Sequence, residues 1–490
     1  MTMMSKTGLT RRSVLGSVGA GVGALGLSGA TPVQANLLPK SESSESYDVV
    51  VIGSGMAGCA AALQASEAGA RVVVLEKLGE NRMGGNSLLA GGGFSIPELD
   101  SRASKDAYVA DYETYCLGRG NNEIFRLMSE NGEADLEWLA SHGVALAAPA
   151  LWPPNRVRMV IASPGFFAGM PSMFRRIRQR LPELGVEFRF ETKARQLIMD
   201  DRGAVSGVRA VGPDGVTDYL ARAVVIATGG YAANSQILEA YSDPNAGAMM
   251  VRGVKTATGD GHIMAQAAGA GLKGMGGLMA LHVAAVDGIE TAAGQPAAVV
   301  PHAISINREG RRFVDESRGY VAHGKAVLEQ PGQSTSLVFD QTLRDSVAEG
   351  VIGTFNRLGR PFHKADTLDE LAEMVGVPVD QFVRTVEEFN AAVVDGAALG
   401  ATPPKAKLAN RIETAPFYAF SPLVPGVTLT FGAVMIDAEA RVLEPDGRVI
   451  PGLFAAGEGA GPVFFHDYIG GGSLTNCLVM GRIAGRTAAS

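Results

Sequence analysis

The sequence predicts an α/β protein in which a Rossmann-like domain is split by an inserted α+β domain. Two observations predict this fold. An apolar run at 47–52, an Ala-rich helical segment at 56–68 and a second apolar run at 71–76 alternate as in a βαβ unit. Strand-like segments return near the C-terminus, after a stretch at 284–416 in which loops lengthen and strands become fewer. This return predicts one domain built from two separate parts of the chain.

The first 35 residues are predicted to be a signal peptide that is not part of the fold. Thr10-Arg11-Arg12-Ser13 begins a weakly apolar, Gly-rich run, and Val33-Gln34-Ala35 offers a small-residue cleavage site. The paired arginines indicate the twin-arginine route, which exports folded proteins. We therefore expect a periplasmic protein with no transmembrane segment after signal removal. Residues 36–46, rich in Ser and Glu, are predicted to be a linker.

The remaining elements are predicted from hydrophobic periodicity and turn residues. Before the insertion they are helices at 104–116, 122–141 and 171–184, a hairpin turn at Pro213-Asp214-Gly215 and a buried strand at 223–227. Helical patterns in the insertion occupy 341–348, 367–375 and 378–395, and strands at 428–436 and 453–456 precede a final helix at 473–488. We therefore expect one domain at 47–283 and 417–490 and a second at 284–416.

Composition argues against several classes of protein. The chain has 490 residues, 46% of them hydrophobic, so it can bury a large core. Its formal net charge is −7, and no basic tract runs along the mature chain, which argues against a nucleic-acid partner. Cys59, Cys116 and Cys477 do not form a C-x-x-C pair, so neither a zinc ribbon nor another metal site is predicted.

The βαβ unit carries a dinucleotide-binding motif. Gly53-Ser54-Gly55-Met56-Ala57-Gly58 follows the first strand and opens the helix. In this motif the first Gly permits a tight turn, the second lets a pyrophosphate approach the backbone, and the third lets helix and strand pack closely. The helix N-terminus offers N–H groups to the phosphates. Glu76 ends the next strand, eighteen residues after Gly58, where an acid accepts hydrogen bonds from ribose hydroxyls.

Further glycine-rich segments follow in a characteristic order. They are Gly84-Gly85-Asn86-Ser87, Gly91-Gly92-Gly93, Ala227-Thr228-Gly229-Gly230 and Gly452-Leu453-Phe454-Ala455-Ala456-Gly457-Glu458. In this order the segments resemble the flavoprotein subunits of the fumarate reductase and succinate dehydrogenase family, and the likeness covers about 47–490. The resemblance implies an FAD cofactor, and a split FAD-binding domain closed by the inserted domain as a substrate cap.

The resemblance also implies roles for matched positions. Thr228 and Gly229 would border the pyrophosphate, Ala194 the adenine, and Glu458 the ribityl hydroxyls. The backbone of Gly472, Ser473 and Leu474 would face the N1/O2 edge of the flavin. The full set implied to bind FAD is Gly53, Gly55, Met56, Ala57, Gly58, Glu76, Lys77, Asn86, Ser87, Gly91, Gly92, Ala194, Thr228, Gly229, Asp260, Glu458, Ser473 and Leu474. Members that bind FAD covalently use a His near 86–92; the first His here is His142, so non-covalent FAD is expected.

Several departures from the family pattern move the substrate away from fumarate. The positions of the family's dicarboxylate-binding His and Arg hold Leu429 and Tyr468, and the catalytic Arg position holds Tyr320. A Thr-Glu pair of the family aligns near Gln295-Pro296. A dianion bound without these groups would lack partners for its charge.

The two tyrosines resemble those of the 3-ketosteroid Δ1-dehydrogenase branch. That resemblance implies that Tyr320 removes the proton α to a ketone, and that Tyr468, with the backbone N–H of Gly472, polarises the ketone oxygen. The expected reaction is α,β-dehydrogenation of a 3-oxosteroid or other cyclic ketone, or the reverse reduction. A separate electron carrier or acceptor would be a partner, because the chain encodes no haem.

Two alternatives remain open. Residues 464–475, with Phe431-Gly432 upstream, also resemble the tricarballylate dehydrogenase branch, which implies a carboxylate substrate and basic partners for it. Candidate partners are Arg156, Arg158, Arg252, Lys255, His282, Arg318 and His466, and we single out His282, Arg318 and His466 as substrate-binding. The non-enzyme alternative is a flavoprotein that only transfers electrons.

Overall fold

The computed structural model describes residues 39–153, 155–284, 296–357, 359–360 and 362–490. The chain divides into two units, 1–40 and 41–490, and of the first unit only Pro39 and Lys40 are described. The predicted signal peptide therefore lies outside the described residues. Everything below concerns residues 41–490.

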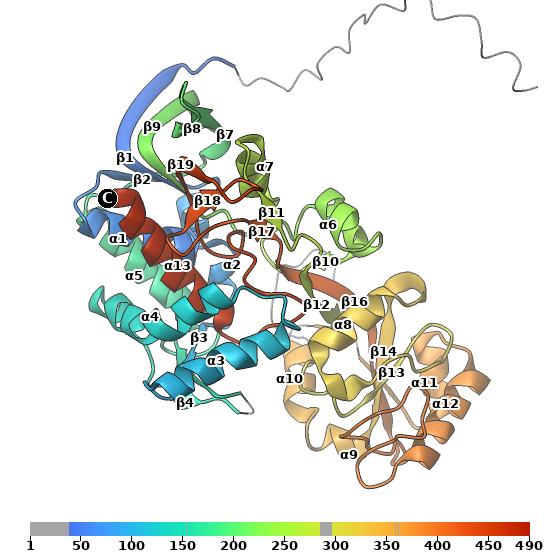
Figure 1. Ribbon diagram of the computed structural model, residues 1–490. Coiled ribbons are helices and arrows are strands. Elements are labelled where there is room, and N and C mark those ends of the chain that lie inside the picture. The colour runs from blue at the N-terminus through green and yellow to red at the C-terminus, as the bar shows by residue number, and fades with distance from the viewer. Residues whose placement is uncertain (1–38, 154, 285–295, 358, 361) are drawn as a thin grey trace, which may run out of the picture. The chain divides into compact units, whose positions relative to one another are not determined.

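A central sheet of eight strands carries the predicted Rossmann-like layer (Figure 1). Six of its strands follow the order β18 (Arg441–Leu443), β19 (Val449–Ala455), β9 (Gly215–Ile226), β1 (Ser43–Ile52), β2 (Val72–Leu75) and β6 (Glu187–Arg189). The pairs β19–β9, β9–β1, β1–β2 and β2–β6 are parallel. Two further strands, β7 (Lys193–Met199) and β8 (Val205–Gly212), extend β9 in an antiparallel hairpin meander, as the predicted turn at 213–215 requires.

The ends of β1 and β9 and the whole of β2 are apolar because both faces of the sheet are covered there. All four residues of β2 are buried, and so are the last four of β1. The helices of the first half of the chain are α1 (Met56–Glu67), α2 (Gly85–Leu88), α3 (Arg102–Tyr115), α4 (Asn122–Ser141), α5 (Gly169–Glu183), α6 (Ser235–Tyr241) and α7 (Asp260–Ala267). The C-terminal helix α13 (Gly472–Ala489) packs directly on α1.

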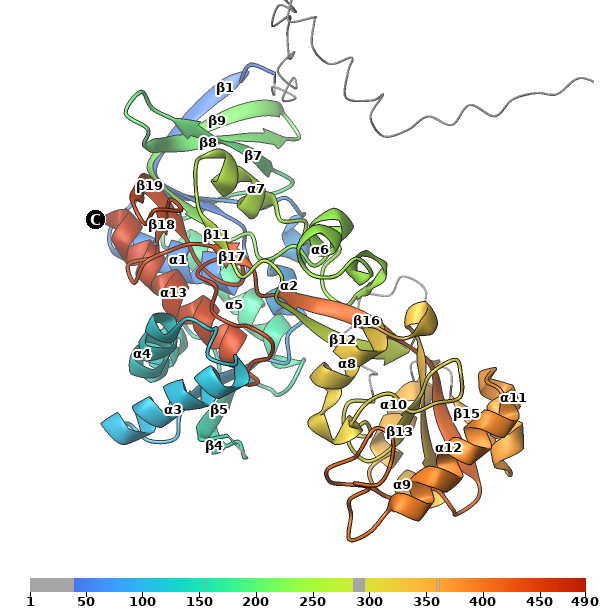
Figure 2. The same cartoon turned by 45° about the vertical axis from the view of Figure 1, so that its right-hand side comes forward.

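A second sheet of six strands is organised around one long strand, β16 (Phe417–Thr430). Its other strands are β10 (Met250–Val251), β12 (Leu278–Ala284), β13 (Ile304–Ile306), β14 (Thr335–Asp340) and β15 (His363–Ala365). The helices of this part are α8 (Tyr320–Leu328), α9 (Gln341–Arg344), α10 (Glu349–Arg357), α11 (Leu368–Val375) and α12 (Val379–Ala392). Figure 2 shows β12 and β16 running side by side into this sheet, as their antiparallel pairing requires.

Two small sheets complete the fold. They are β3 (Gly93–Pro97), β5 (Val157–Ile161) and β4 (Ala150–Leu151), and the pair β11 (Leu272–Lys273) and β17 (Ala433–Val434). Most predicted elements are confirmed to within a few residues. The structure adds α2, α6, α7, α8 and α10, which the sequence pattern did not indicate, and it ends the predicted helix at 341–348 after one turn. The predicted strand at 428–436 is wrong as one element, because it is divided between the end of β16 and β17.

The limits of the two predicted domains stay a prediction. Composition placed the insertion at 284–416. The strands β12 and β16, which flank this range, belong to the same sheet as the strands inside it. Similarly, β1 begins at Ser43, inside the predicted linker, because Ser43 pairs with Thr217 of β9. In the described ranges no helix is both long enough and apolar enough to cross a membrane.

A buried charge cluster fixes the start of α8. Arg312 donates to both carboxylate oxygens of Glu316, at 3.2 and 2.8 Å, and Lys405 Nζ lies 3.6 Å from the same carboxylate. The three side chains are at most 1% exposed. Burial lowers the pKa of Lys405 to about 8, with Glu316 opposing that shift. Glu316 opens the short 3-10 turn that leads through Gly319 into Tyr320.

Glu316→Gln should therefore be strongly destabilising. The change leaves two buried cations without their carboxylate, which we expect to lower the free energy of unfolding by about 3–5 kcal/mol. Denaturant unfolding of the purified protein measures this. The matched control is Glu439→Gln, which removes an exposed partner of Arg441 and should change stability by less than about 1 kcal/mol. Equal effects of the two substitutions would contradict the assigned role of the cluster.

Candidate active site

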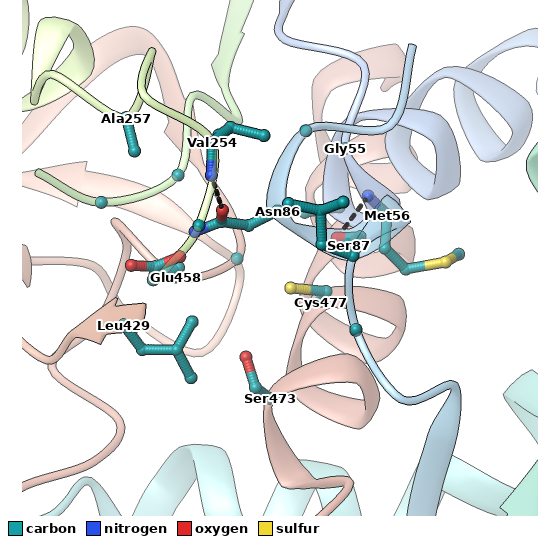
Figure 3. A pocket seen from close by; sticks show the side chains of 18 of the residues that line it. Gly55, Met56, Asn86, Ser87, Val254, Ala257, Leu429, Glu458, Ser473 and Cys477 are labelled. Atoms are coloured by element: carbon teal, nitrogen blue, oxygen red, sulfur yellow. Dashed lines mark hydrogen bonds between the residues drawn. The ribbon is translucent and has the colours of Figure 1, made fainter. Parts of the chain in front are cut away.

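A cavity of about 400 Å³ lies where the central sheet, the second sheet and the N-terminus of α13 meet. Its wall includes the β1–α1 turn, the end of β2, α2, the loop after β9 and the segment 252–257. Figure 3 shows side chains from these separate parts of the chain converging on one space, among them Asn86, Leu429, Glu458 and Ser473. This position, at the carboxyl ends of parallel strands, is where open α/β sheets bind ligands.

The β1–α1 turn has the steric form that the glycine motif predicts. Gly53 has φ +101°, and a Cβ there would lie 2.5 Å from the carbonyl oxygen of Ala227, at the end of β9. A Cβ on Gly58 would overlap the carbonyl oxygen of Gly53. Gly55, by contrast, lines the cavity, and the nearest atom that a Cβ on it would meet is the carbonyl oxygen of Gly84, 3.7 Å away. The turn is thus closed toward the protein and open toward a ligand.

The acid after β2 also faces this turn. Glu76 accepts hydrogen bonds from the amide and hydroxyl of Ser54, at 3.1 and 2.5 Å, and from the amide of Leu78 at 2.9 Å. It is 7% exposed and lines the cavity. These bonds fix the carboxylate beside the turn. Its contact with a ribose stays a prediction.

A charged cluster lies next to Glu76 at the same end of the cavity. Asp260, the first residue of α7, forms ion pairs with Lys77 at 2.7 Å and with Lys193 at 3.0 Å. Burial would raise the pKa of Asp260, but the two lysines outweigh it and hold that pKa below its usual value. Lys77 also donates to the carbonyl of Thr256. Ala194, predicted beside the adenine, lines the cavity next to Lys193.

The middle of the cavity is polar and tightly connected. Asn86 accepts from the amide of Val254 at 2.8 Å, and Ser87 accepts from the amide of Met56 at 3.2 Å (Figure 3). Glu458 accepts from the amide of Thr430 at 3.0 Å. Burial raises the pKa of Glu458, with the Thr430 hydrogen bonds opposing that shift. Gly91 and Gly92, predicted to line the flavin, also line the cavity, as do Thr228 and Gly229, predicted to border the pyrophosphate.

The other end of the cavity holds both predicted catalytic tyrosines. Tyr320 begins α8, and Tyr468 lies in the segment that leads into α13. Burial raises the pKa of each hydroxyl, and Asp467 adds to both shifts. The ring of Tyr468 packs against Phe464, with ring centres 5.5 Å apart. The structure thus brings together two tyrosines that are 148 residues apart in the chain.

Arg252 completes this end and was not distinguished by the sequence from six other basic candidates. It directly follows β10 and is 2% exposed, and it lines the cavity. Burial lowers its pKa to about 10, while Tyr320 and Tyr468 oppose that shift electrostatically. Its positive charge in turn lowers the pKa of both tyrosines against the larger effect of burial.

Tyr115 was missed by the sequence analysis. Tyr115 is the last residue of α3, and its hydroxyl donates to the side-chain oxygen of Asn155 at 2.9 Å. Its electrostatic effect raises the pKa of Tyr320. No motif marks it.

The start of α13 only partly matches the prediction. Ser473 and Leu474 line the cavity. The amide of Gly472 instead donates to the carbonyl of Ile469 at 3.0 Å, and a Cβ on Gly472 would overlap the hydroxyl of Tyr112. Gly472 is therefore packed into the protein, and its role as a donor to substrate stays a prediction.

The other basic candidates lie elsewhere. Arg156 pairs with Asp111 and Arg158 with Glu133, while Lys255 and Arg318 are exposed. His466 has φ +66° and contacts Lys325, whose Nζ lies 3.4 Å from its Nδ1. None of these five side chains lines the cavity. His282 stands on β12 opposite Pro425 of β16. Substrate binding by Arg318, His282 and His466 thus stays a prediction.

Comparisons with known proteins identify the ligand of the cavity. The family described as "FAD binding domain" matches residues 48–474. Fumarate reductase (cytochrome) of Shewanella frigidimarina is 31% identical over 459 residues, which cover 91% of this chain and 77% of that protein. Urocanate reductase of Eggerthella lenta is 32% identical over 471 residues, covering 90% and 74%. 4-Oxocyclohexanecarboxylate 2-dehydrogenase of Sinomonas cyclohexanicum is 28% identical over 544 residues, covering 90% and 93%.

Solved structures agree with this fold. A flavocytochrome c3 fumarate reductase in an open conformation superposes with a TM-score of 0.78 at 29% identity, covering 91% of this chain and 79% of that one. The 3-ketosteroid Δ1-dehydrogenase of Sterolibacterium denitrificans superposes with a TM-score of 0.76 at 21% identity, covering 91% and 99%. The latter likeness shows the fold alone.

The residues of the cavity fit FAD. The open face of Gly55 at a helix N-terminus suits the pyrophosphate, and the same cavity is also lined by Asn86, Glu458 and the two tyrosines. The cofactor is therefore FAD, as predicted.

Gly58→Ala should abolish FAD binding. The added methyl would overlap the carbonyl oxygen of Gly53 and force the phosphate-binding turn open. We expect the flavin content of the purified protein to fall by at least about tenfold. The control is Gly350→Ala in α10, where an added Cβ meets no atom within 4 Å and flavin content should stay unchanged. A fully yellow Gly58→Ala protein would contradict the assignment of the turn.

The bond between protein and FAD is predicted to be non-covalent. No histidine is among the described residues that line the cavity, and burial raises the pKa of the Cys477 thiol to about 12, which keeps it protonated. Acid denaturation should therefore release all flavin into the supernatant. Yellow colour that stays with the precipitated chain would overturn this prediction.

Proposed function

We propose, on the premise that this chain belongs to the FAD-dependent fumarate reductase flavoprotein family, that it adds or removes hydrogen across a C–C bond next to a ketone. It is an oxidoreductase, as its relatives are. The observation that carries the proposal is the pair of tyrosines, Tyr320 and Tyr468, on the wall of the FAD cavity.

The two tyrosines divide the proton chemistry. When bound, FAD supplies a hydride acceptor or donor. In the oxidative direction Tyr320 takes the proton from the carbon α to the carbonyl, and in the reductive direction it returns that proton. Tyr468 donates a hydrogen bond to the carbonyl oxygen, where negative charge develops as the α proton leaves. The positive charge of Arg252 favours the anionic form of both Tyr320 and Tyr468.

Gly472 is the second donor to the carbonyl oxygen in this proposal. Because its N–H donates to Ile469 in the structure, this role requires the turn before α13 to open. Tyr468 is the donor that already lines the cavity.

The name of one relative supports a carbonyl-bearing substrate. That relative acts on 4-oxocyclohexanecarboxylate, a cyclic ketone. A second candidate is reduction of an unsaturated carboxylate, since other relatives are a fumarate reductase and a urocanate reductase. Buried Arg252 is the observation that favours this second candidate.

Three wider assignments belong to the same proposal. The segment 284–416 would close over the substrate as a cap. A separate electron carrier or acceptor would exchange electrons with the flavin. Arg11 and Arg12 would direct export of the FAD-loaded protein to the periplasm, although both lie outside the described residues.

An anaerobic half-reaction tests the reaction class. The yellow protein is mixed with a cyclic ketone, a 3-oxosteroid, tricarballylate or succinate, and flavin absorbance is followed. Bleaching by a ketone supports the proposal. Bleaching by succinate or tricarballylate alone would move the reaction to the carboxylate candidate.

Tyr320→Phe should remove the acid/base group and keep the cavity. We expect the rate of flavin reduction by a ketone to fall by about 10²–10⁴-fold, with flavin content unchanged. Tyr241→Phe, an exposed tyrosine on α6, is the control and should keep wild-type rates. A Tyr320→Phe protein that keeps the wild-type rate would show that another group transfers the proton.

The pH profile gives a second readout of the same variant. Because burial raises the pKa of Tyr320, its base form stays scarce at neutral pH and increases as pH rises. The rate of ketone oxidation should climb with pH and show no plateau below about pH 10. Stopped-flow measurements across this range check it, and Tyr320→Phe should lose the climb.

A further inference from the structure

We propose that Arg252 binds a carboxylate of the substrate, and that the substrate is an oxo acid. Such a molecule has a mainly apolar, ring-sized body with one ketone and one carboxylate. This inference rests on the proposed function for the ketone and adds the carboxylate to it.

Arg252 is held in place by two neighbouring segments, β16 and α2. Its amide donates to the carbonyl of Val427 at 2.8 Å, and its Nη1 donates to the hydroxyl of Thr428 at 3.2 Å, so β16 fixes both ends of the residue. The next residue, Gly253, packs against Asn86 so closely that a Cβ would overlap the amide side chain. A guanidinium held in this way is preorganised for a planar carboxylate and loses little entropy on binding it.

The surroundings of Arg252 favour an anion. Arg252 is 2% exposed, and burial lowers its pKa, so a nearby negative charge would stabilise its protonated form. The electrostatic effects of Tyr320 and Tyr468 raise the pKa of Arg252, whereas the positive charge of Arg360 lowers it. A ligand carboxylate is the complementary charge for this group of residues.

The cavity offers charge for one carboxylate. Of the described basic residues that line it, Lys77 and Lys193 are both ion-paired with Asp260 beside Glu76. Arg252 is the basic residue that stands with the tyrosines. A second carboxylate would therefore have to lie against apolar side chains, which costs several kcal/mol by typical values.

Apolar and aromatic side chains also line the cavity. They include Leu429, Met159 and Met279, together with Trp152, Phe166 and Phe167, which are 40%, 46% and 50% exposed. Trp152 and Phe166 face each other with ring centres 5.9 Å apart. Exposed aromatic rings that line a cavity suit a hydrocarbon body. Phenol groups for a ketone, one guanidinium for a carboxylate and apolar side chains in the same cavity together suit an oxo acid.

Equilibrium binding to the FAD-loaded protein tests this inference. The probes are 4-oxocyclohexanecarboxylate, its methyl ester and cyclohexane-1,4-dicarboxylate, and the dissociation constant is read from the change in flavin absorbance and from thermal stabilisation. Wild type should bind the acid at least about tenfold more tightly than the ester or the dicarboxylate.

Substitution of Arg252 locates the effect. Arg252→Gln should weaken the acid by about 30- to 300-fold and leave the ester unchanged. Arg252→Lys keeps the charge and loses the planar guanidinium, so its affinity for the acid should lie between those of wild type and Arg252→Gln. The control is Arg156→Gln, an exposed arginine paired with Asp111, which should bind all probes as wild type does.

Three results would overturn the inference. They are equal binding of acid and ester by wild type, no binding of the acid at all, and equal weakening of acid and ester by Arg252→Gln. If Arg252→Gln does not fold, the wild-type comparison and Arg252→Lys decide the question.

The proposed function is tested apart from this binding. Tyr320→Phe should bind the acid as tightly as wild type does, but the bound acid should not reduce the flavin of this variant. If the acid binds through Arg252 but does not bleach the wild-type flavin, the ketone chemistry fails and the carboxylate site stands. If wild type binds the ester and the acid with equal affinity and oxidises both, the ketone chemistry stands and the carboxylate site fails.

Discussion

The close approach of the β1–α1 turn to the end of β9 is the constraint on which the rest of the site depends. Gly53 leaves no room for a side chain next to Ala227, and Gly58 leaves none next to Gly53. This contact places the N-terminus of α1 at the edge of the sheet. Helix α13 then packs on α1 closely enough that Gly481 lies against the backbone of Ala57. The same contact therefore brings Ser473 and Leu474, at the start of α13, to the cavity.

The opposite wall depends on the second sheet. β16 pairs with both β10 and β12, and it delivers Thr428 and Leu429 to the cavity while fixing Arg252. The buried Arg312–Glu316 pair holds the turn from which Tyr320 begins α8. In the proposed function, the glycine-rich turns bind the redox cofactor. Proton transfer would depend on Arg252, held by β16, on Tyr320, held by the buried cluster, and on Tyr468, which packs against Phe464.

The sequence was sufficient for the dinucleotide-binding unit because that unit depends on a local pattern, whereas FAD was implied by a resemblance carried by segments spread over 47–490. Strand, glycine turn, helix, strand and acid occur within 30 residues, and each of these features has its own residue signature. It also identified Tyr320 and Tyr468 by their motif positions. It could not distinguish Arg252 from Arg156 or the other basic candidates, because only the pairing of β10 with β16 buries one and leaves the other at the surface. The hydrogen bond from Gly472 to Ile469 was equally invisible, since it depends on how a turn closes.

Proton exchange at the α carbon is the most direct measurement of the central claim, that Tyr320 and Tyr468 activate a carbonyl next to the flavin. The FAD-loaded protein is incubated in D₂O with 4-oxocyclohexanecarboxylate, and loss of the α-proton signal is followed by NMR. The account predicts that wild type accelerates this exchange and that Tyr320→Phe does not. Exchange at the uncatalysed rate with wild type, or equal exchange by both proteins, would contradict it.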